Sequence, residues 1–405
     1  MAEDTNCGTR KDRPIGVADD TKGGEEGSAT MNDRGETRPR NALKARGRDL
    51  GLPFPGTTGP CNAITDVSGV EVGCATLVGD PDSGRGSART GVTVVLPRGR
   101  SGPPTAPVWA GFHALNGNGE MTGTHWIREA GYFVGPIGIT NTHSVGAVHQ
   151  AFIRWITGLP GPDLGAYTWL LPVVAETCDA HLNDMNAFHV AEADVLRAIE
   201  TASAGPVAEG NVGGGTGMIC FEFKGGTGTS SRVVDACGGR YTVGCLVQAN
   251  FGIRSQLRIL GVPVGEHLTA HRLWSDEQGS IIVAVATDAP LLPTQLERIA
   301  RRAGLGIGRT GTSSGDGSGD LCLAFSTANL IETARGAAPA IESLAFLPHN
   351  QLNGLFEATA QAVEEAIVNA LIAAEPMVGR EGRRVEAIDH DALLDVMRSY
   401  GRLNA

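Results

Sequence analysis

The feature that most constrains the fold of this chain is a series of short, strongly apolar segments in its second half. Two of them, residues 281–287 and 321–326, are apolar on nearly every residue and show no alternation with polar ones. Strands of this kind are expected where both faces of a sheet are covered. The other predicted strands of this series are residues 218–223, 232–235 and 241–249. The sequence therefore predicts a sheet buried between other layers.

An earlier series of β-branched segments is separated by glycine-rich turns and predicts further strands at residues 64–72, 92–96 and 136–140. Elsewhere, apolar residues recur at intervals of three and four, the helical period, in residues 144–156, 188–202, 294–303 and, most strongly, 352–374. Interleaved helices and strands predict a layered α/β or α+β sandwich. No repeat or Pro/Ser-rich linker divides the later chain, so residues 41–405 are predicted to form a single catalytic domain.

Residues 1–40 differ from the rest because they are rich in charged and small polar residues and poor in apolar ones. Such a segment cannot bury enough apolar surface to offset its chain entropy, so a disordered polar tail is predicted. The whole chain has 33 Lys and Arg against 44 Asp and Glu, a formal net charge of −11. Its basic residues form no stripe that fits a phosphate backbone, so no nucleic-acid partner is expected.

The eight cysteines form no CxxC pair, and several stand within apolar runs. They are predicted to be reduced and mostly buried thiols. The beginning of the chain has no apolar stretch like that of a signal peptide, and no run of eighteen apolar residues occurs. These features predict a cytoplasmic protein without a membrane partner.

Gly279 and Ser280 stand where a polar loop meets the apolar run of residues 281–287. Taken alone, the dipeptide is typical of a turn followed by a strand. Gly279 has no side chain, however, and can adopt strained backbone angles that open its carbonyl to attack by the Ser280 hydroxyl. Cleavage would free an α-amine on Ser280 with a pKa of about 7.7–8.0, which suits proton transfer near neutral pH. Nucleophile and base would then belong to one residue of an initially inactive precursor.

The residues around this dipeptide belong to a wider pattern. After the apolar strand come Ala286-Thr287-Asp288-Ala289-Pro290-Leu291-Leu292-Pro293, Gln295-Leu296 and Arg301-Arg302-Ala303. Further segments are Asn62-Ala63-Ile64-Thr65-Asp66-Val67, Asn116-Gly117-Asn118-Gly119-Glu120-Met121-Thr122-Gly123, Val174-Ala175-Glu176-Thr177, Asn183-Asp184, Gly210-Asn211-Val212-Gly213-Gly214-Gly215-Thr216-Gly217 and Val247-Gln248-Ala249-Asn250-Phe251-Gly252. Together they resemble the DmpA/BapA family of aminopeptidases. Several motifs in one order cover nearly everything after the tail and are far more specific than any single one.

The resemblance implies an α+β fold, the DmpA/ArgJ-like four-layer αββα sandwich of the N-terminal-nucleophile type. It also implies that the chain is cut into an α-chain ending at Gly279 and a β-chain beginning at Ser280, which stay associated. Members of the family assemble further, commonly as tetramers of such heterodimers, so a homo-oligomer is expected.

By the same resemblance, Ser280 is the nucleophile, and Ser318 and Asp320 assist proton transfer. The family usually has a glutamate at the second of these positions, and Asp320 is one methylene shorter. From the residues alone, a hydroxyl and a carboxylate two positions apart could point to the same face of the loop that precedes the strand at 321–326. The composition of residues 312–318 nevertheless favours an ordinary polar turn. Asn250 matches the family asparagine that donates its amide to the developing oxyanion, and is otherwise a cap or turn residue.

The resemblance also assigns residues to substrate binding. Glu176 matches a glutamate that binds the free amino group of the substrate, and without the family it would be interpreted as a solvated strand end. Cys178 stands where the family usually has Tyr or Trp, and it offers a smaller pocket wall and only a weak S–H donor. Cys178 is not favoured as an alternative nucleophile, because no histidine can be placed beside it and buried cysteines are usually inert.

Three other patterns were weighed as cofactor sites. Residues 306–311 fit G-x-G-x-x-G but follow a helix-like segment and no strand, so they are assigned to a loop. Residues 210–217 lack the Gly-Lys-Ser/Thr ending of a phosphate-binding loop, and the family resemblance implies that they pack near the site. His267 and His271 are spaced like metal ligands but lack the glutamate between them and a third ligand. No metal or nucleotide is expected.

The predicted function is that of a self-processing serine aminopeptidase or amidase. It would release N-terminal residues from small peptides, amides or esters with a free amine, including D-alanine or β-amino acid derivatives, through an acyl-Ser280 intermediate. One alternative is a biosynthetic amide hydrolase or acyltransferase of the same fold, which would have no use for the carboxylate of Glu176. The other alternative is an uncleaved protein that binds amines without turnover. The presence of Gly279, Ser280, Asn250 and Ser318 argues against it.

Overall fold

The computed structural model describes residues 30–31, 37–38, 44–79, 86–159, 169–330 and 341–403. The chain divides into two units, Met1–Ala42 and Leu43–Ala405. In the first unit only two antiparallel strands of two residues are described, β1 (Thr30–Met31) and β2 (Thr37–Arg38). The rest of the predicted disordered tail lies outside the described residues, and the single catalytic domain of residues 41–405 stays a prediction.

The second unit is built on two β-sheets. The larger has six strands in the order β11-β12-β13-β14-β5-β6. Their bounds are Gly226–Ala236 (β11), Gly239–Asn250 (β12), Ser280–Thr287 (β13), Gly319–Ser326 (β14), Pro107–Gly117 (β5) and Tyr132–Val134 (β6). The smaller has the order β3-β4-β7-β8, with bounds Glu71–Val78 (β3), Arg89–Leu96 (β4), Ile137–Asn141 (β7) and Val173–Thr177 (β8). Two neighbouring pairs, β13 with β14 and β7 with β8, are parallel.

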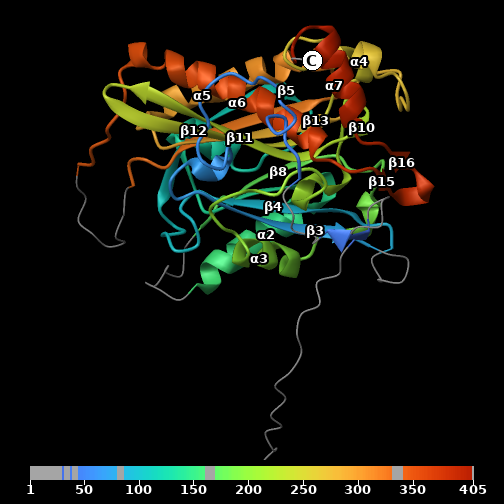
Figure 1. The fold of residues 1–405 in the computed structure, drawn as a ribbon. Coiled ribbons are helices and arrows are strands. Elements are labelled where there is room, and N and C mark those ends of the chain that lie inside the picture. Colours follow the sequence, from blue (N-terminus) through green and yellow to red (C-terminus); the bar gives the residue numbers. More distant parts are fainter. Residues whose placement is uncertain are drawn as a thin grey trace, which may run out of the picture. The chain divides into compact units, whose positions relative to one another are not determined.

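Helices cover the outer face of each sheet, as Figure 1 shows. The six-stranded sheet carries α5 (Pro293–Arg309) and α6 (Asn353–Ile372), and the four-stranded sheet carries α2 (Val145–Gly158) and α3 (Glu192–Glu200). Shorter helices are α1 (Thr124–Ala130), α4 (Val264–His267) and α7 (His390–Ser399). The layers follow one another as helix, sheet, sheet, helix, which confirms the predicted α+β four-layer sandwich.

The packing of β13 explains why this strand is apolar on successive residues. Its residues Ile281, Val283 and Val285 belong to the core beneath α5 and α6, whereas Ile282, Ala284 and Ala286 belong to the core between the two sheets. Successive side chains of a strand point to opposite faces, so both faces of β13 are buried. By the same alternation, Ser280 lies on the face that is turned toward the second sheet.

Two predicted elements of the first half begin later in the structure. The strand expected from residue 64 is preceded by a 3-10 helix, Ile64–Asp66, because the Asp66 carboxylate accepts hydrogen bonds from the backbone N–H groups of Cys61 and Ala63. The helix expected from residue 188 starts only at Glu192, since Phe188 has a positive φ of 50°. Strands β5 and β6 were not predicted.

Two predictions in the second half are wrong. The strand at residues 218–223 is interrupted between β9 (Ile219–Cys220) and β10 (Phe223–Lys224), because Phe221 and Glu222 have positive φ values of 50° and 62°. The supposed loop at residues 306–311 begins inside α5, which continues to Arg309. The glycines of that segment therefore do not mark the end of the helix.

The seven described cysteines are all free thiols. Three of them, Cys220, Cys245 and Cys322, are buried, so the expectation of mostly buried thiols was wrong for this part of the chain. Among the described residues, no helix combines the length and the apolar character that a membrane crossing requires.

Candidate active site

Ser280 is the first residue of β13, and its cross-strand partner is Asn250, the last residue of β12. The serine is 6% exposed. Its Oγ accepts a hydrogen bond from the backbone N–H of Gly319 at 2.9 Å. Because Gly319 is the donor, this contact fixes the Ser280 oxygen without using the hydroxyl proton.

Gly279 has a backbone conformation that favours glycine, with a φ of 103°. A Cβ at this position would lie 1.8 Å from the carbonyl oxygen of Asn250, far inside van der Waals contact. Any side chain would therefore force the turn or the end of β12 to move. Gly279 thus has a backbone conformation that favours glycine, and its role in self-cleavage stays a prediction.

Asp320 lies next to Ser280 on the neighbouring parallel strand, since Asp320 pairs with Ile281. Its Oδ1 accepts a hydrogen bond from Ser318 Oγ at 2.6 Å, and its Oδ2 accepts one from Ser314 Oγ. Burial raises the pKa of the Asp320 carboxyl, the two serine hydrogen bonds oppose this rise, and the charge of Glu277 adds to it. The turn expected at 312–318 exists, but it closes around a buried carboxylate.

Two asparagines of the 116–123 segment hold this turn in place. Asn116 Nδ2 donates to the carbonyl oxygen of Gly315 at 2.6 Å, and Asn118 Nδ2 donates to that of Gly317 at 2.9 Å. Asn116 lies on β5, beside a register shift between Asp320 and Leu321. The segment thus positions the turn that carries Ser318.

Asn250 has its side-chain amide oriented by two backbone groups. Oδ1 accepts a hydrogen bond from the N–H of Ile219 at 2.8 Å, and Nδ2 donates to the carbonyl oxygen of Cys178 at 3.1 Å. The residue is 5% exposed. This places a fixed, neutral donor beside Ser280, which is the kind of group that stabilises an oxyanion.

Glu176 is buried at the end of β8, so its interpretation as a solvated strand end was wrong. Its Oε1 accepts a hydrogen bond from the N–H of Glu120 at 3.0 Å, and its Oε2 accepts one from Thr142 Oγ1. Gly119 lies between this carboxylate and Gly319, whose N–H donates to Ser280. A Cβ on Gly119 would lie 3.2 Å from Glu176 Oε1 and 3.4 Å from the Cα of Gly319. The carboxylate is therefore brought close to the Ser280 site.

Cys178 follows β8 and presents part of its surface to solvent. Its backbone carbonyl is the acceptor for Asn250. Desolvation by the surrounding protein raises the pKa of the thiol, and the carboxylates of Asp179 and Glu176 add to the rise. A thiol with a raised pKa stays protonated at neutral pH and is a poor nucleophile. This argues against Cys178 as an alternative nucleophile, and its place in the substrate pocket stays a prediction.

Residues 62–385 match the sequence pattern of peptidase family S58. The chain belongs to peptidase family S58. It is 50% identical over 379 residues to the beta-peptidyl aminopeptidase BapA of Sphingosinicella microcystinivorans, which covers 89% of this chain and 93% of the relative. The BapA of Sphingosinicella xenopeptidilytica is 46% identical over 373 residues, covering 87% of this chain and 91% of that relative.

Solved structures show the same likeness. The L-aminopeptidase D-Ala-esterase/amidase of Ochrobactrum anthropi, a prototype for the serine aminopeptidases with a variant of the Ntn hydrolase fold, is 50% identical with a TM-score of 0.82. The match covers 89% of this chain and all of that one. A beta-aminopeptidase of Burkholderia sp. is 49% identical with a TM-score of 0.80, covering 88% of this chain and 99% of its own. This S58 peptidase is a serine aminopeptidase, and the expected family, fold and enzyme class are confirmed.

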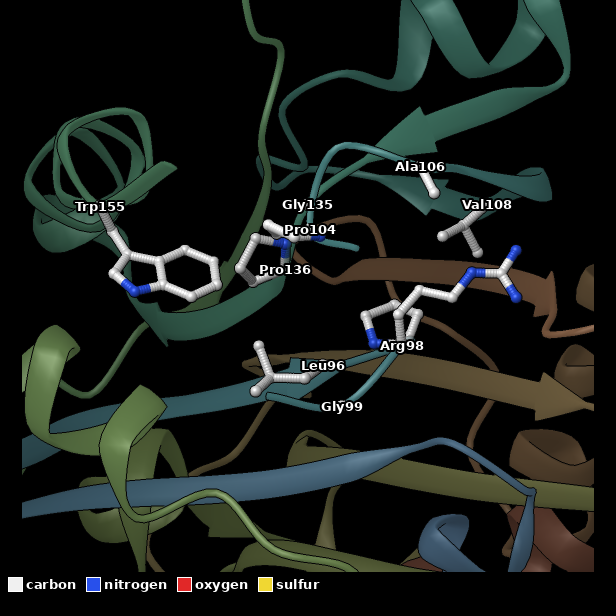
Figure 2. A pocket seen from close by; sticks show the side chains of 10 residues that line it. Leu96, Arg98, Gly99, Pro104, Ala106, Val108, Gly135, Pro136 and Trp155 are labelled. Carbon is white, nitrogen blue, oxygen red and sulfur yellow. The ribbon is translucent and has the colours of Figure 1, made fainter. Parts of the chain in front are cut away.

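A hollow of this S58 peptidase lies away from the site and is lined by Leu96, Pro97, Arg98, Gly99, Pro104, Ala106, Val108, Gly135, Pro136 and Trp155. Figure 2 shows the Trp155 indole beside Pro136, with the Arg98 guanidinium on the opposite side. Arg98 donates to the carbonyl of Thr327, just beyond the far end of β14 from Gly319. At about 3.3 Å per residue, this end lies roughly 25 Å from the Gly319 N–H that donates to Ser280. The hollow is not part of the Ser280 site.

The sequence predicts self-cleavage between Gly279 and Ser280, and the geometry of Gly279 predicts that Gly279→Ala would slow this reaction by about 100-fold. The added Cβ displaces the Gly279 carbonyl from the Ser280 hydroxyl, and small misplacements of reacting groups have effects of this size. The matched control is Gly308→Ala on α5, where a Cβ meets nothing within 4 Å. Cleavage is followed by gel electrophoresis after synthesis in a cell-free system. Equal cleavage rates for the two variants would contradict the role given to Gly279.

Proposed function

We propose that this S58 peptidase cuts itself between Gly279 and Ser280, and then releases N-terminal residues from small peptides, amides and esters through an acyl-Ser280 intermediate. One observation carries the proposal. Ser280 directly follows Gly279, and its Oγ accepts a hydrogen bond from the Gly319 N–H. The φ of 103° at Gly279 and its contact with the Asn250 carbonyl leave no room for a side chain.

Self-cleavage begins when Ser280 Oγ attacks the carbonyl carbon of Gly279. The amide C–N bond breaks, an ester C–O bond forms, and the hydroxyl proton passes to the nitrogen of Ser280. Water then hydrolyses the ester, which returns the Ser280 hydroxyl and leaves Gly279 as a carboxylate. The α-chain would end at Gly279, and the β-chain would begin at Ser280 with a free amine.

Substrate turnover uses the same attacking oxygen, Ser280 Oγ. The α-amine of Ser280, with an ordinary pKa of about 7.7–8.0, takes the hydroxyl proton as Oγ attacks the substrate carbonyl. The Asn250 amide donates to the oxyanion, which is worth about 2.7–4 kcal/mol in other hydrolases. Ser318 donates its own proton to Asp320, so the lone pairs of Ser318 Oγ remain available to relay a proton at the site. Water releases the acyl group.

Glu176 would bind the ammonium group of the substrate. Each of its oxygens already accepts one hydrogen bond, from Glu120 and Thr142, and a carboxylate has about four acceptor positions. Two positions are thus left for charge-assisted bonds to an amine. Since similar proteins are a beta-peptidyl aminopeptidase and an L-aminopeptidase D-Ala-esterase/amidase, we infer substrates with N-terminal β-amino acids or D-alanine derivatives. The small Cys178 leaves room for a bulky N-terminal side chain.

A biosynthetic amide hydrolase or acyltransferase is the second candidate. Such an enzyme has no need for an anion close to its nucleophile. Glu176 has a buried carboxylate, and Gly119 lies between it and Gly319. This carboxylate favours the aminopeptidase.

The tetramer of heterodimers and the cytoplasmic location stay predictions. Light scattering after size-exclusion chromatography tests the assembly.

Intact-mass spectrometry under denaturing conditions tests the self-cleavage. We expect two fragments that meet at Gly279 and Ser280 for the wild type, and one full-length chain for Ser280→Ala. The matched control is Ser275→Ala in the same segment, which lies on the surface and is expected to cleave like the wild type. A single uncut mass for the wild type after long incubation would rule out the proposed mechanism.

The charge on Glu176 gives a second prediction. Glu176→Gln keeps the shape of the side chain but loses a charge-assisted hydrogen bond of about 1.5–3 kcal/mol, so kcat/KM for substrates with a free amine is expected to fall about 10- to 150-fold. Substrates with an acetylated amine are expected to lose much less. Glu120→Gln, an exposed neighbour, serves as the control. Equal losses for free and acetylated substrates would contradict an amine-binding role.

A further inference from the structure

One side chain fastens the segment in front of the scissile bond. Glu277 stands two residues before Gly279, and its Oε1 accepts a hydrogen bond from Thr312 Oγ1. Its Oε2 accepts one from the backbone N–H of Gly315 at 3.2 Å. Thr312 and Gly315 belong to the turn that leads to Ser318. A single carboxylate therefore joins the chain before the cleavage point to the turn beside Asp320.

The contacts of Glu277 continue to the Asp320 carboxylate. Thr312 and Gly315 flank Ser314, which has a positive φ of 55°. The N–H of Ser314 donates to Thr312 Oγ1 at 2.9 Å, and its hydroxyl donates to Asp320 Oδ2. Glu277, Thr312, Ser314 and Asp320 thus form a continuous series of hydrogen bonds. The position of Glu277 is coupled through it to the orientation of the carboxylate beside the nucleophile.

A second carboxylate fixes the same segment further upstream. Glu222 is buried and accepts hydrogen bonds from the backbone N–H groups of Leu273 and Trp274, the latter at 3.1 Å. Between Trp274 and Ser280, the side chains of Ser275, Asp276 and Gln278 are exposed. Glu277 is half-buried and is turned inward to the turn. Of the side chains between Trp274 and Gly279, that of Glu277 is therefore the one that fastens the segment to the turn.

We infer that Glu277 is a positioning residue for self-cleavage, whose carboxylate clamps the segment to the turn at 312–315 so that the Gly279 carbonyl stays beside Ser280 Oγ. The inference rests on the self-cleavage proposed above. Glu277 takes no proton in the reaction and acts only by holding the reacting groups together, which strongly accelerates intramolecular steps.

Cleavage itself weakens the clamp. It creates a carboxylate on Gly279, two residues from Glu277 and close to the buried Asp320. Like charges at this separation repel each other, more strongly where water is excluded. Repulsion of this kind weakens the hold of Glu277 on the turn after the bond breaks, which favours departure of the segment from the approach to Ser280.

The test compares Glu277→Ala, Glu277→Gln and the wild type as full-length chains made by cell-free translation and followed by gel electrophoresis after synthesis stops. We expect Glu277→Ala to slow self-cleavage at least ten-fold. Glu277→Gln keeps one acceptor oxygen and is expected to be intermediate. The matched control is Asp276→Ala, which removes the same charge from an exposed side chain. The Asp276 carboxylate accepts a hydrogen bond from Ser275 Oγ. We expect this control within two-fold of the wild type.

Melting temperatures separate positioning from loss of structure. Each substitution is also made in a Ser280→Ala background, which keeps the chain in one piece. A slowed Glu277→Ala whose melting temperature stays within about 3 °C of its background supports the inference, and a larger drop counts against it. A Glu277→Ala rate equal to that of Asp276→Ala overturns the inference and leaves the proposed function standing. A wild type that never cleaves overturns both.

Discussion

The backbone pairing of β12 with β13 is the interaction on which the site depends. Asn250 and Ser280 are cross-strand partners, so one register places the proposed oxyanion donor beside the proposed nucleophile. The same pairing brings the Asn250 carbonyl so close to Gly279 that no side chain fits there. The parallel strand β14 then adds the N–H of Gly319 and the carboxylate of Asp320 on the other side. A slip by one residue would separate all of these groups.

Two buried carboxylates flank the proposed nucleophile, Ser280, and both are held by uncharged donors. Asp320 accepts hydrogen bonds from the hydroxyls of Ser314 and Ser318. Glu176 accepts one from a backbone N–H and one from the hydroxyl of Thr142. Neutral donors satisfy a carboxylate without cancelling its charge. Each group therefore keeps an electrostatic pull, which suits a proton relay at Asp320 and attraction of an ammonium group at Glu176.

The sequence predicted those parts of the structure that follow from local pattern. Strands β13 and β14 and helix α6 have unmistakable apolar patterns, and Gly279 with Ser280 stood out by its place before a strand. The break at Phe221 and Glu222 was missed because positive φ at residues other than glycine is imposed by tertiary contacts. Glu277 and Ser314 were missed because their contacts join loops distant in sequence and follow no spacing rule. Ser318 and Asp320 stood out only through the family resemblance.

The most direct test of the account is to find the atom that carries the acyl group during turnover. The purified enzyme is mixed with an amino-acid ester that has a free amine, quenched in acid during the steady state, and digested for peptide mapping by mass spectrometry. The account predicts an acyl adduct on the hydroxyl of Ser280, in a peptide whose first residue is Ser280. An adduct on Cys178, or on Ser280 within an uncut chain, would contradict it.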